Sequence, residues 1–238
     1  MKKVIIIGAT SGIGKQLALL FAANDYKIGI TGRRTALLND LKIQHPEAFE
    51  IAAMDITQTD NLCEQLEVLT NQLGGLDLLV LSSGTGELNP ELDFALGHHT
   101  IMTNTIGFTQ IADWAFRYFE KQQSGHLAVI TSIAGLRGSS LAPAYNASKA
   151  YQINYLEGLR QKANKSKHKI SITDIRPGFV DTAMAKGDGQ FWVSSPEKAA
   201  KQIYSAINRK KEVVYITKRW RLIAILLKAL PRSLYKKM

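Results

Sequence analysis

Short apolar runs rich in β-branched residues alternate with longer helical patterns along the whole chain of 238 residues. Runs that are apolar almost throughout are typical of strands buried on both faces of a parallel sheet. Seven of them occur, at residues 3–7, 27–31, 49–54, 76–82, 126–132, 169–175 and 212–217. Helical patterns lie between them, for example at residues 12–23, 57–73 and 196–208. The alternation predicts a doubly wound, parallel α/β sheet of about seven strands with right-handed crossovers.

The composition indicates one large folded unit. Hydrophobic residues make up 45% of the chain, and no linker, repeat or low-complexity segment divides it, so we expect a single domain over residues 1–217 and a tail over residues 218–238. Cys63 is the only cysteine. It excludes an internal disulfide, fits a reducing cytoplasmic compartment, and is expected to be a small buried side chain of a helix. The apolar run at residues 4–7 is too short for a secretory signal, and no stretch approaches the ~20 apolar residues of a spanning helix.

The formal net charge of +10 is concentrated in one segment. Residues 209–238 hold ten basic side chains and one acidic side chain, a net charge of +9, whereas residues 1–208 hold 20 basic and 19 acidic ones. A nucleic-acid-binding domain would present clustered basic residues on its folded body. The nearly neutral body therefore argues against a nucleic-acid partner.

The segment VIIIGATSGIG joins the first predicted strand to the first predicted helix. Gly8 permits a tight turn off the strand, and Gly12 and Gly14 let the backbone and the helix approach a pyrophosphate closely. The helix N-terminus then offers unpaired N–H groups and a partial positive charge. In this strand–loop–helix context the glycines predict a Rossmann-type dinucleotide site.

The spacing of these glycines resembles the TGxxxGxG pattern of the classical short-chain dehydrogenase/reductase family, with Ile7 in place of the threonine. The resemblance covers essentially residues 3–182. It implies cofactor contacts from the loop residues Gly8, Thr10, Ser11, Gly12, Ile13 and Gly14. It also implies contacts from Asp55 and Ile56 at the adenine, from Gly84, and from Pro177, Gly178, Val180 and Thr182 in the segment IRPGFVDT that closes over the nicotinamide.

One segment departs from the family pattern. Where the family has Asn-Asn-Ala-Gly, this chain has Leu81, Ser82, Ser83 and Gly84. In the family those asparagines mainly brace the central sheet, so the resemblance implies altered bracing and unaltered chemistry.

The end of the second predicted strand indicates which nicotinamide cofactor binds. A site that selects NAD usually places Asp or Glu there to accept a hydrogen bond from the ribose 2′-OH, whereas an arginine accommodates a 2′-phosphate. This chain has Gly32 at that position, followed by Arg33 and Arg34. We interpret Arg33 as the phosphate ligand and Arg34 as a second partner that stacks on the adenine, the alternative being two solvated residues at the start of a helix. The predicted cofactor is NADP(H).

The segment YNASK places Tyr145 and Lys149 four residues apart, thirteen residues after Ser132. Taken alone, this spacing is also that of an ordinary helix with a partly buried tyrosine. On a helix the two side chains share one face, and Ser132 stands at the carboxyl end of a predicted strand, where ligands of doubly wound sheets bind. A lysine ammonium beside a phenol, together with the positive charge of an oxidised nicotinamide, favours the phenolate and lowers the pKa of the tyrosine.

These residues predict carbonyl reduction. Tyr145 is expected to be the acid/base, Lys149 to adjust its pKa and hold the ribose, and Ser132 to position the carbonyl. The resemblance adds Asn104, from MTNTIGF, as the residue that anchors a water in a proton relay through Lys149. We therefore predict an NADP(H)-dependent oxidoreductase that acts on a small carbonyl or alcohol, and a homo-oligomer, either dimer or tetramer.

Two other functions use the same fold. A non-catalytic NADP(H) sensor usually lacks the tyrosine or the lysine, both of which are present here, and a sugar-nucleotide epimerase generally has a larger C-terminal substrate domain. The loops 85–99, 133–142 and 183–195 determine the substrate, which the sequence does not identify. Within them, Phe191 and Trp192 either cap an apolar substrate or pack the loop down. His98 and His99 have no partner at metal-ligand spacing and are expected to be partly exposed helix residues.

The tail is basic and apolar at once. On one continuous helix, Lys218, Arg221, Lys228 and Arg232 would fall within about 80° of arc at 100° per residue, and six leucines and isoleucines would fill most of the remainder. Such a helix, with Trp220 at its start, is typical of attachment to an anionic membrane surface. The alternative is a helix that packs on its own body or on a partner subunit.

Overall fold

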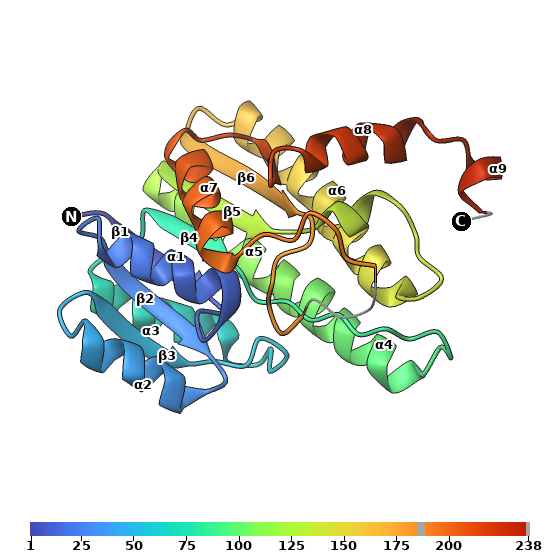
Figure 1. The fold of residues 1–238 in the computed structure, drawn as a ribbon. Coiled ribbons are helices and arrows are strands. Elements are labelled where there is room, and N and C mark those ends of the chain that lie inside the picture. Colours follow the sequence, from blue (N-terminus) through green and yellow to red (C-terminus); the bar gives the residue numbers. More distant parts are fainter. Residues whose placement is uncertain (185–188, 237–238) are drawn as a thin grey trace.

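The computed structural model describes residues 1–184 and 189–236. Seven parallel strands form one sheet in the order β3-β2-β1-β4-β5-β6-β7 (Figure 1). Their bounds are β1 Lys3–Ile7, β2 Lys27–Gly32, β3 Phe49–Ala53, β4 Leu78–Leu81, β5 Ser124–Ile130, β6 Lys169–Pro177 and β7 Val213–Ile216. The predicted fold class is therefore confirmed, and no end of a predicted strand is displaced by more than two residues.

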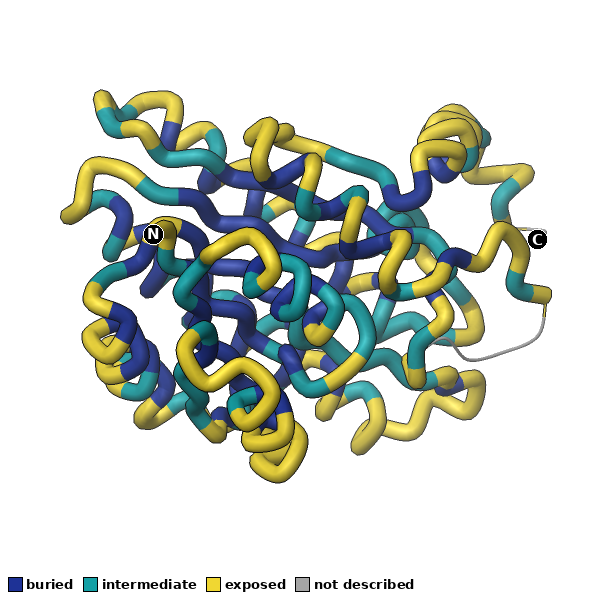
Figure 2. Tube along the Cα trace, turned by 60° about the vertical axis from the view of Figure 1, so that its left-hand side comes forward, coloured by how far each residue is buried: buried dark blue, intermediate teal, exposed yellow. Residues whose placement is uncertain are grey.

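Helices cover both faces of the sheet (Figure 1). On one face, α1, α2 and α7 contribute Leu17, Leu38 and Ile203 to a buried core, and on the other α3, α5 and α6 contribute Leu66, Phe116 and Leu156 to a second. Figure 2 shows this distribution, with buried residues along the strands and exposed ones on the outer helices. The bounds of these helices are α1 Gly12–Ala22, α2 Thr35–Gln44, α3 Leu62–Leu73, α5 Phe108–Gln122, α6 Pro143–Lys165 and α7 Pro196–Asn208.

Two helix starts illustrate how local sequence sets the elements. The predicted start at Ser195-Pro196 is confirmed, because Ser195 Oγ accepts a hydrogen bond from Lys198 N at 3.2 Å and caps α7. The predicted helix at residues 57–73 was wrong at its start, since α3 begins at Leu62. Asp55 Oδ1 accepts hydrogen bonds from Thr57 N and Thr57 Oγ1 at 3.0 and 2.9 Å, and this local turn competes with the helix.

The strand order reverses between β1 and β4, which are hydrogen-bonded neighbours from Val4↔Leu78 to Ile7↔Leu81. In doubly wound sheets, ligands bind outside the carboxyl ends of the strands at this reversal. After β4 the chain forms α4 (Phe94–Ile101) and then a π-helical segment, Met102–Gly107, which leads directly into α5. The π-helical segment holds Asn104, which is completely buried.

The tail differs from the single helix expected over residues 218–238. α8 spans Trp220–Ala229, the backbone is extended at Leu230 before Pro231, and a short α9 follows at Arg232–Tyr235. Arg221 and Lys228 therefore lie on α8, whereas Lys218 precedes it and Arg232 belongs to α9. Within the described residues, no helix has the length and apolar content needed to cross a bilayer.

Candidate active site

The loop between β1 and α1 requires glycine at three positions. Gly8 and Gly12 have positive φ angles of 87° and 55°. A Cβ at Gly14 would lie 2.1 Å from the carbonyl oxygen of Gly8, so only glycine lets α1 begin this close to the loop. The N-cap of α1, Ser11, makes no side-chain hydrogen bond to the helix, which leaves the N–H groups of the first turn available to an anion.

Arg33 and Arg34 follow β2 and lie in different surroundings. Arg34 donates to Thr10 Oγ1 at 2.6 Å and to Ser11 Oγ at 2.7 Å, which ties the end of β2 to the glycine loop. Arg33 is exposed and makes no hydrogen bond or ion pair with any residue in the described ranges. Among the described residues, Arg34 is thus held against the glycine loop, whereas the neighbouring Arg33 is exposed to solvent.

The remaining residues assigned to the cofactor follow β3 and β4 or begin α1. Asp55 is partly buried and forms the turn after β3. Ile56 is buried against Gly107, where an added Cβ would lie 2.2 Å from the Ile56 carbonyl oxygen. Ile13 is partly buried at the start of α1. Gly84 follows β4, where a Cβ would lie 3.4 Å from Asn104 Oδ1 and 3.5 Å from Lys149 Nζ.

The segment after β6 lies against both the glycine loop and the tail. A Cβ at Gly12 would lie 3.2 Å from Thr182 Cγ2, so Thr182 borders the loop. Pro177 is the last residue of β6, and Val180 is buried and pairs with Ser194 in an isolated bridge. A Cβ at Gly178 would lie 2.0 Å from the Trp220 indole, which places the start of α8 directly on this segment.

Ser132, Tyr145 and Lys149 converge beyond the ends of β4 and β5. Ser132 stands two residues after β5 and caps a short 3-10 turn, Ile133–Leu136, through Ala134 N at 3.1 Å. Its hydroxyl is close enough to Tyr145 to lower the pKa of the phenol. Lys149 Nζ lies 5.9 Å from the centre of the Tyr145 ring. Gly86 also lies against that ring, since a Cβ there would be 2.5 Å from it.

The pKa values of the protein by itself differ from the expectation. Burial raises the pKa of Tyr145 above 10, and the Ser132 hydroxyl lowers it. Burial also lowers the pKa of Lys149 to about 8, while the carboxylate of Asp174 raises it. The predicted lowering by Lys149 is thus not the dominant effect. The physical reason is that burial removes the hydration of the phenolate. Lys149 itself donates to Ile130 O at 3.1 Å and to Gln152 Oε1 at 3.0 Å.

Asn104 is joined to the same cluster by its backbone and its side chain. Its amide group bonds both backbone groups of Thr85, at 2.9 and 2.7 Å, and donates to Ser148 Oγ at 3.0 Å. Its backbone carbonyl accepts a hydrogen bond from Gln152 Nε2 at 2.8 Å. The sequence interpretation missed Gln152. A polar residue three positions after Lys149, on the helix face that packs on the sheet, was the available signal.

The aromatic residues of the loop pack on the tail. The Phe191 ring stacks on Trp220 with centres 5.0 Å apart, and the Trp192 ring lies 6.0 Å from Trp220 and 5.3 Å from the Arg219 guanidinium. Both loop residues remain exposed at 47% and 38%, so they pack the loop and also border its solvent side. Residues 185–188 of the predicted substrate loop lie outside the described residues.

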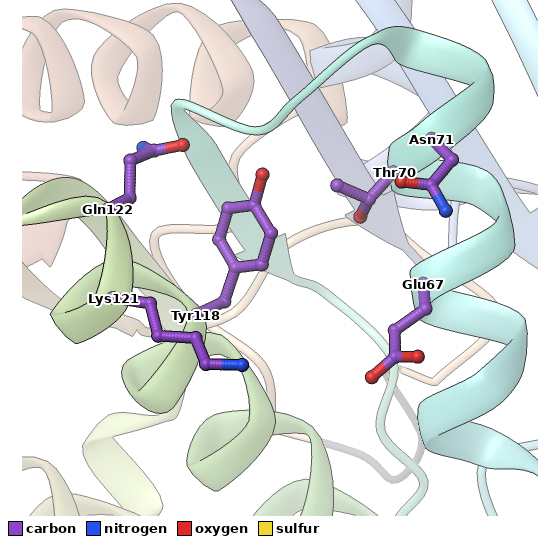
Figure 3. Close-up of a pocket in the computed structure, with 6 residues that line it drawn as sticks. All are labelled: Glu67, Thr70, Asn71, Tyr118, Lys121 and Gln122. Atoms are coloured by element: carbon purple, nitrogen blue, oxygen red, sulfur yellow. The ribbon is translucent and has the colours of Figure 1, made fainter.

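Other candidate groups lie apart from this site. His98 and His99 are exposed in α4, as expected, and within the described ranges no three His, Cys, Asp or Glu residues are placed to hold a metal. Cys63 was predicted to be buried, but it is partly exposed. A cavity of about 490 Å³ lies between α3 and α5 (Figure 3), lined by Glu67, Thr70, Asn71, Tyr118, Lys121 and Gln122. Gln122 bonds Leu76 O, just before β4 begins, so this cavity is at the end of the sheet opposite the catalytic cluster.

Comparisons with known proteins identify the class to which this site belongs. The family described as short chain dehydrogenase matches residues 2–191. The chain therefore belongs to the short-chain dehydrogenase family and is an oxidoreductase of that family. Among curated relatives, an uncharacterised oxidoreductase of Myxococcus xanthus is 30% identical over 188 residues, which cover 77% of this chain and 74% of the relative. One of Mycobacterium tuberculosis is 28% identical over 219 residues, 88% of this chain and 85% of the relative.

Solved structures have the same fold. ElxO with NADP bound superposes with a TM-score of 0.79 at 25% identity and covers 90% of this chain and 96% of its own. A short-chain dehydrogenase from Streptomyces avermitilis gives a TM-score of 0.82 at 22% identity, covering 95% of this chain and 91% of its own. Serine dehydrogenase from Escherichia coli gives 0.77 at 23% identity, with coverages of 90% and 96%. A nicotinamide cofactor and a small-molecule substrate follow from the family.

Proposed function

We propose that this protein is an NADP(H)-dependent oxidoreductase that transfers a hydride between the nicotinamide and a carbonyl or secondary alcohol. The convergence of Ser132, Tyr145 and Lys149 beside the glycine loop is the observation that carries the proposal. A protein that only senses NADP(H) needs the loop and the arginines but not this cluster. We therefore favour an enzyme over a sensor.

NADP(H) fits the residues that border the loop. The unpaired N–H groups at the start of α1 suit a pyrophosphate, and the exposed guanidinium of Arg33 suits the 2′-phosphate. A solved relative, ElxO, has NADP bound, which supports the same cofactor here. The residues proposed to hold it are Gly8, Thr10, Ser11, Gly12, Ile13, Gly14, Arg33, Arg34, Asp55, Ile56, Gly84, Asn104, Tyr145, Lys149, Pro177, Gly178, Val180 and Thr182.

In this mechanism the cofactor supplies the hydride, and the chain supplies the proton and the geometry. The Ser132 hydroxyl donates a hydrogen bond to the carbonyl oxygen and holds it against Tyr145. Tyr145 donates its phenolic proton to that oxygen as the alkoxide forms, and in the reverse direction its phenolate accepts the proton of the alcohol. The Lys149 ammonium stabilises the phenolate that remains and donates to the ribose.

Tyr145→Phe tests this assignment because it removes only the proton. A carbonyl substrate is first found by a screen that follows NADPH absorbance. Its turnover by Tyr145→Phe should fall about 100- to 10,000-fold, while NADPH binding is kept. Lys149→Ala should reduce both. Tyr151→Phe is the matched control, since Tyr151 lies on the same helix and its hydroxyl bonds Thr109 outside the cluster. A Tyr145→Phe enzyme with near wild-type turnover would contradict the assignment.

The proposal extends to where the enzyme acts. It places a homo-oligomer, either dimer or tetramer, in the cytoplasm at the inner face of a membrane, with an apolar carbonyl as substrate. The support is the exposed face of α8, which we call the α8 stripe: Leu222, Ile225 and Leu226, exposed at 66%, 57% and 58%. The opposite face of α8 packs on the body through Trp220 and Ala224, which are buried, with only 3% and 1% of their surface exposed.

Basic residues flank the α8 stripe. Lys218, Arg219, Arg221 and Lys228 are exposed, and no acidic residue occurs after Glu212. An apolar stripe with cations on its borders matches the anionic headgroup region of a bilayer, where each Lys or Arg contributes about 1 kcal/mol. Because Trp220 contacts both Gly178 and Phe191, the attached helix would hold the substrate loop near the lipid.

A further inference from the structure

The side chain of Gln152 connects two groups of the catalytic cluster. It is completely buried on α6, one turn after Lys149. Its Oε1 accepts a hydrogen bond from Lys149 Nζ at 3.0 Å, and its Nε2 donates to the Asn104 carbonyl at 2.8 Å. The family resemblance links these two groups through a water, whereas here an amide side chain contacts both.

We infer that Gln152 is a positioning residue that fixes the Lys149 ammonium for the proton transfer at Tyr145. The inference rests on the proposed function for its catalytic consequence. Its structural content, a lysine held by a neutral amide, is independent of turnover.

Hydrogen-bond accounting explains the effect of this contact. A lysine ammonium has three N–H donors, and two of them are taken by Ile130 O and Gln152 Oε1. One donor remains for the side of the ammonium that faces Tyr145 and the ribose. Since Gln152 is itself oriented by the Asn104 carbonyl, its oxygen and not its NH₂ group faces Lys149. The bulge of the π-helical segment that carries Asn104 thereby helps to set the direction of the lysine.

The charges around Lys149 make a neutral amide the suitable neighbour. Tyr145 lies next to it on α6, and Asp174 on β6 is the nearby acid. Asp174 is already paired with Arg176 at 2.6 Å and accepts from Thr131 Oγ1 at 2.6 Å. A carboxylate at position 152 would neutralise the ammonium that is needed at Tyr145, and an apolar side chain would leave one of its donors unpaired.

Two substitutions with opposite effects on Lys149 test the inference. Gln152→Leu removes an acceptor of the charged form and should lower the pKa of Lys149, whereas the isosteric Gln152→Glu should raise it. The pKa is measured by NMR titration of the lysine side chain in the protein without cofactor, assigned with Lys149→Ala. In both variants the net positive charge at Tyr145 falls near neutral pH. The limb of the kcat/KM profile for alcohol oxidation, which requires the Tyr145 phenolate, should therefore move upward by about one pH unit, equal to a tenfold loss at pH 7.

Gln110→Leu is the matched control. Gln110 on α5 also donates to a backbone carbonyl, Thr59 O at 2.7 Å, but it has no contact with Lys149. It should leave both the lysine pKa and the kcat/KM profile unchanged. If Gln152→Leu does not fold, Gln152→Glu alone decides the matter. An unchanged pKa of Lys149 in the folded variants overturns the inference, and a shifted pKa with no carbonyl turnover in any form would instead contradict the proposed function.

Discussion

Arg33 and Arg34, neighbours in sequence, offer a residue-scale test of the cofactor. We expect Arg33→Ala to weaken NADPH binding roughly 10- to 100-fold and NADH binding hardly at all, because only NADPH carries the 2′-phosphate that this exposed guanidinium would pair with. Calorimetric titration of both cofactors measures the difference.

Arg34→Ala is the informative comparison for that experiment. Arg34 bonds the hydroxyls of Thr10 and Ser11, so its loss should loosen the glycine loop and weaken both cofactors. Equal losses for NADPH and NADH in Arg33→Ala would remove the phosphate role and leave Arg33 as a solvated surface residue.

Side chains whose partners are far away in sequence were the ones that sequence reasoning missed. Tyr145 and Lys149 were predicted to share a helix face because a helix repeats every 3.6 residues, and they lie in one cluster. The contact of Gln152 with the Asn104 carbonyl spans 48 residues and depends on how α6 packs against the π-helical segment. No local pattern contains that information, so Gln152 and the pKa values of its neighbours required the structure.

At the scale of elements, a titratable histidine lies buried where β5 pairs with β6. His126 is 7% exposed on β5, with Nε2 2.8 Å from Thr173 Oγ1 on β6. Burial, with a smaller contribution from the charge of Lys210, lowers the pKa of His126 to about 4. Between pH 6.5 and 4 the unfolded chain therefore binds more protons than the folded one, and the free energy of unfolding decreases as the pH falls through this window.

This pairing gives a prediction for stability. Between pH 7.5 and pH 5, wild type should lose about 2 kcal/mol more unfolding free energy than His126→Gln, which keeps a side-chain partner for Thr173 but does not titrate. Urea denaturation at the two pH values measures it. His99→Gln, at an exposed position on α4, should behave as wild type. An identical pH dependence for His126→Gln and wild type would contradict a buried neutral histidine.

Sheet elements followed from the sequence more closely than helix ends. Each strand is apolar almost throughout because both of its faces are covered by helices, and this requirement is visible in the sequence itself. The start of α3 depends instead on the Asp55–Thr57 turn, and the end of α8 on the extended backbone before Pro231. Local hydrogen bonds and one proline therefore make these helices shorter than the periodic pattern of the sequence predicts.

At the scale of the whole molecule, the position of the tail connects charge to the active site. Its net basic charge was readable from the sequence, but which of its apolar residues face the body was not. The contact of Trp220 with Gly178 and Phe191 orients α8 and leaves the α8 stripe outward. In Figure 1, α8 lies at the edge of the molecule beyond β6.

We expect the protein to sediment with liposomes that contain anionic lipid at low salt, and to be released at high salt. The physical reason is that basic residues beside the α8 stripe are attracted to the anionic surface, an attraction that salt screens within about 10 Å at 0.1 M. Leu222→Ser with Leu226→Ser should abolish sedimentation by removing the apolar contribution. Arg221→Glu with Lys228→Glu should do the same by reversing the electrostatic one.

Ile43→Ser is the matched control, because Ile43 is 77% exposed on α2, at a distance in the fold from α8, and its loss should change nothing. Liposomes of neutral lipid should leave the intact protein in the supernatant. The competing account buries the α8 stripe in a subunit contact. It predicts that Leu222→Ser with Leu226→Ser reduces the oligomer observed by analytical ultracentrifugation, and that wild type stays in the supernatant with every lipid and salt. That pair of results would replace the membrane surface with a second copy of this chain.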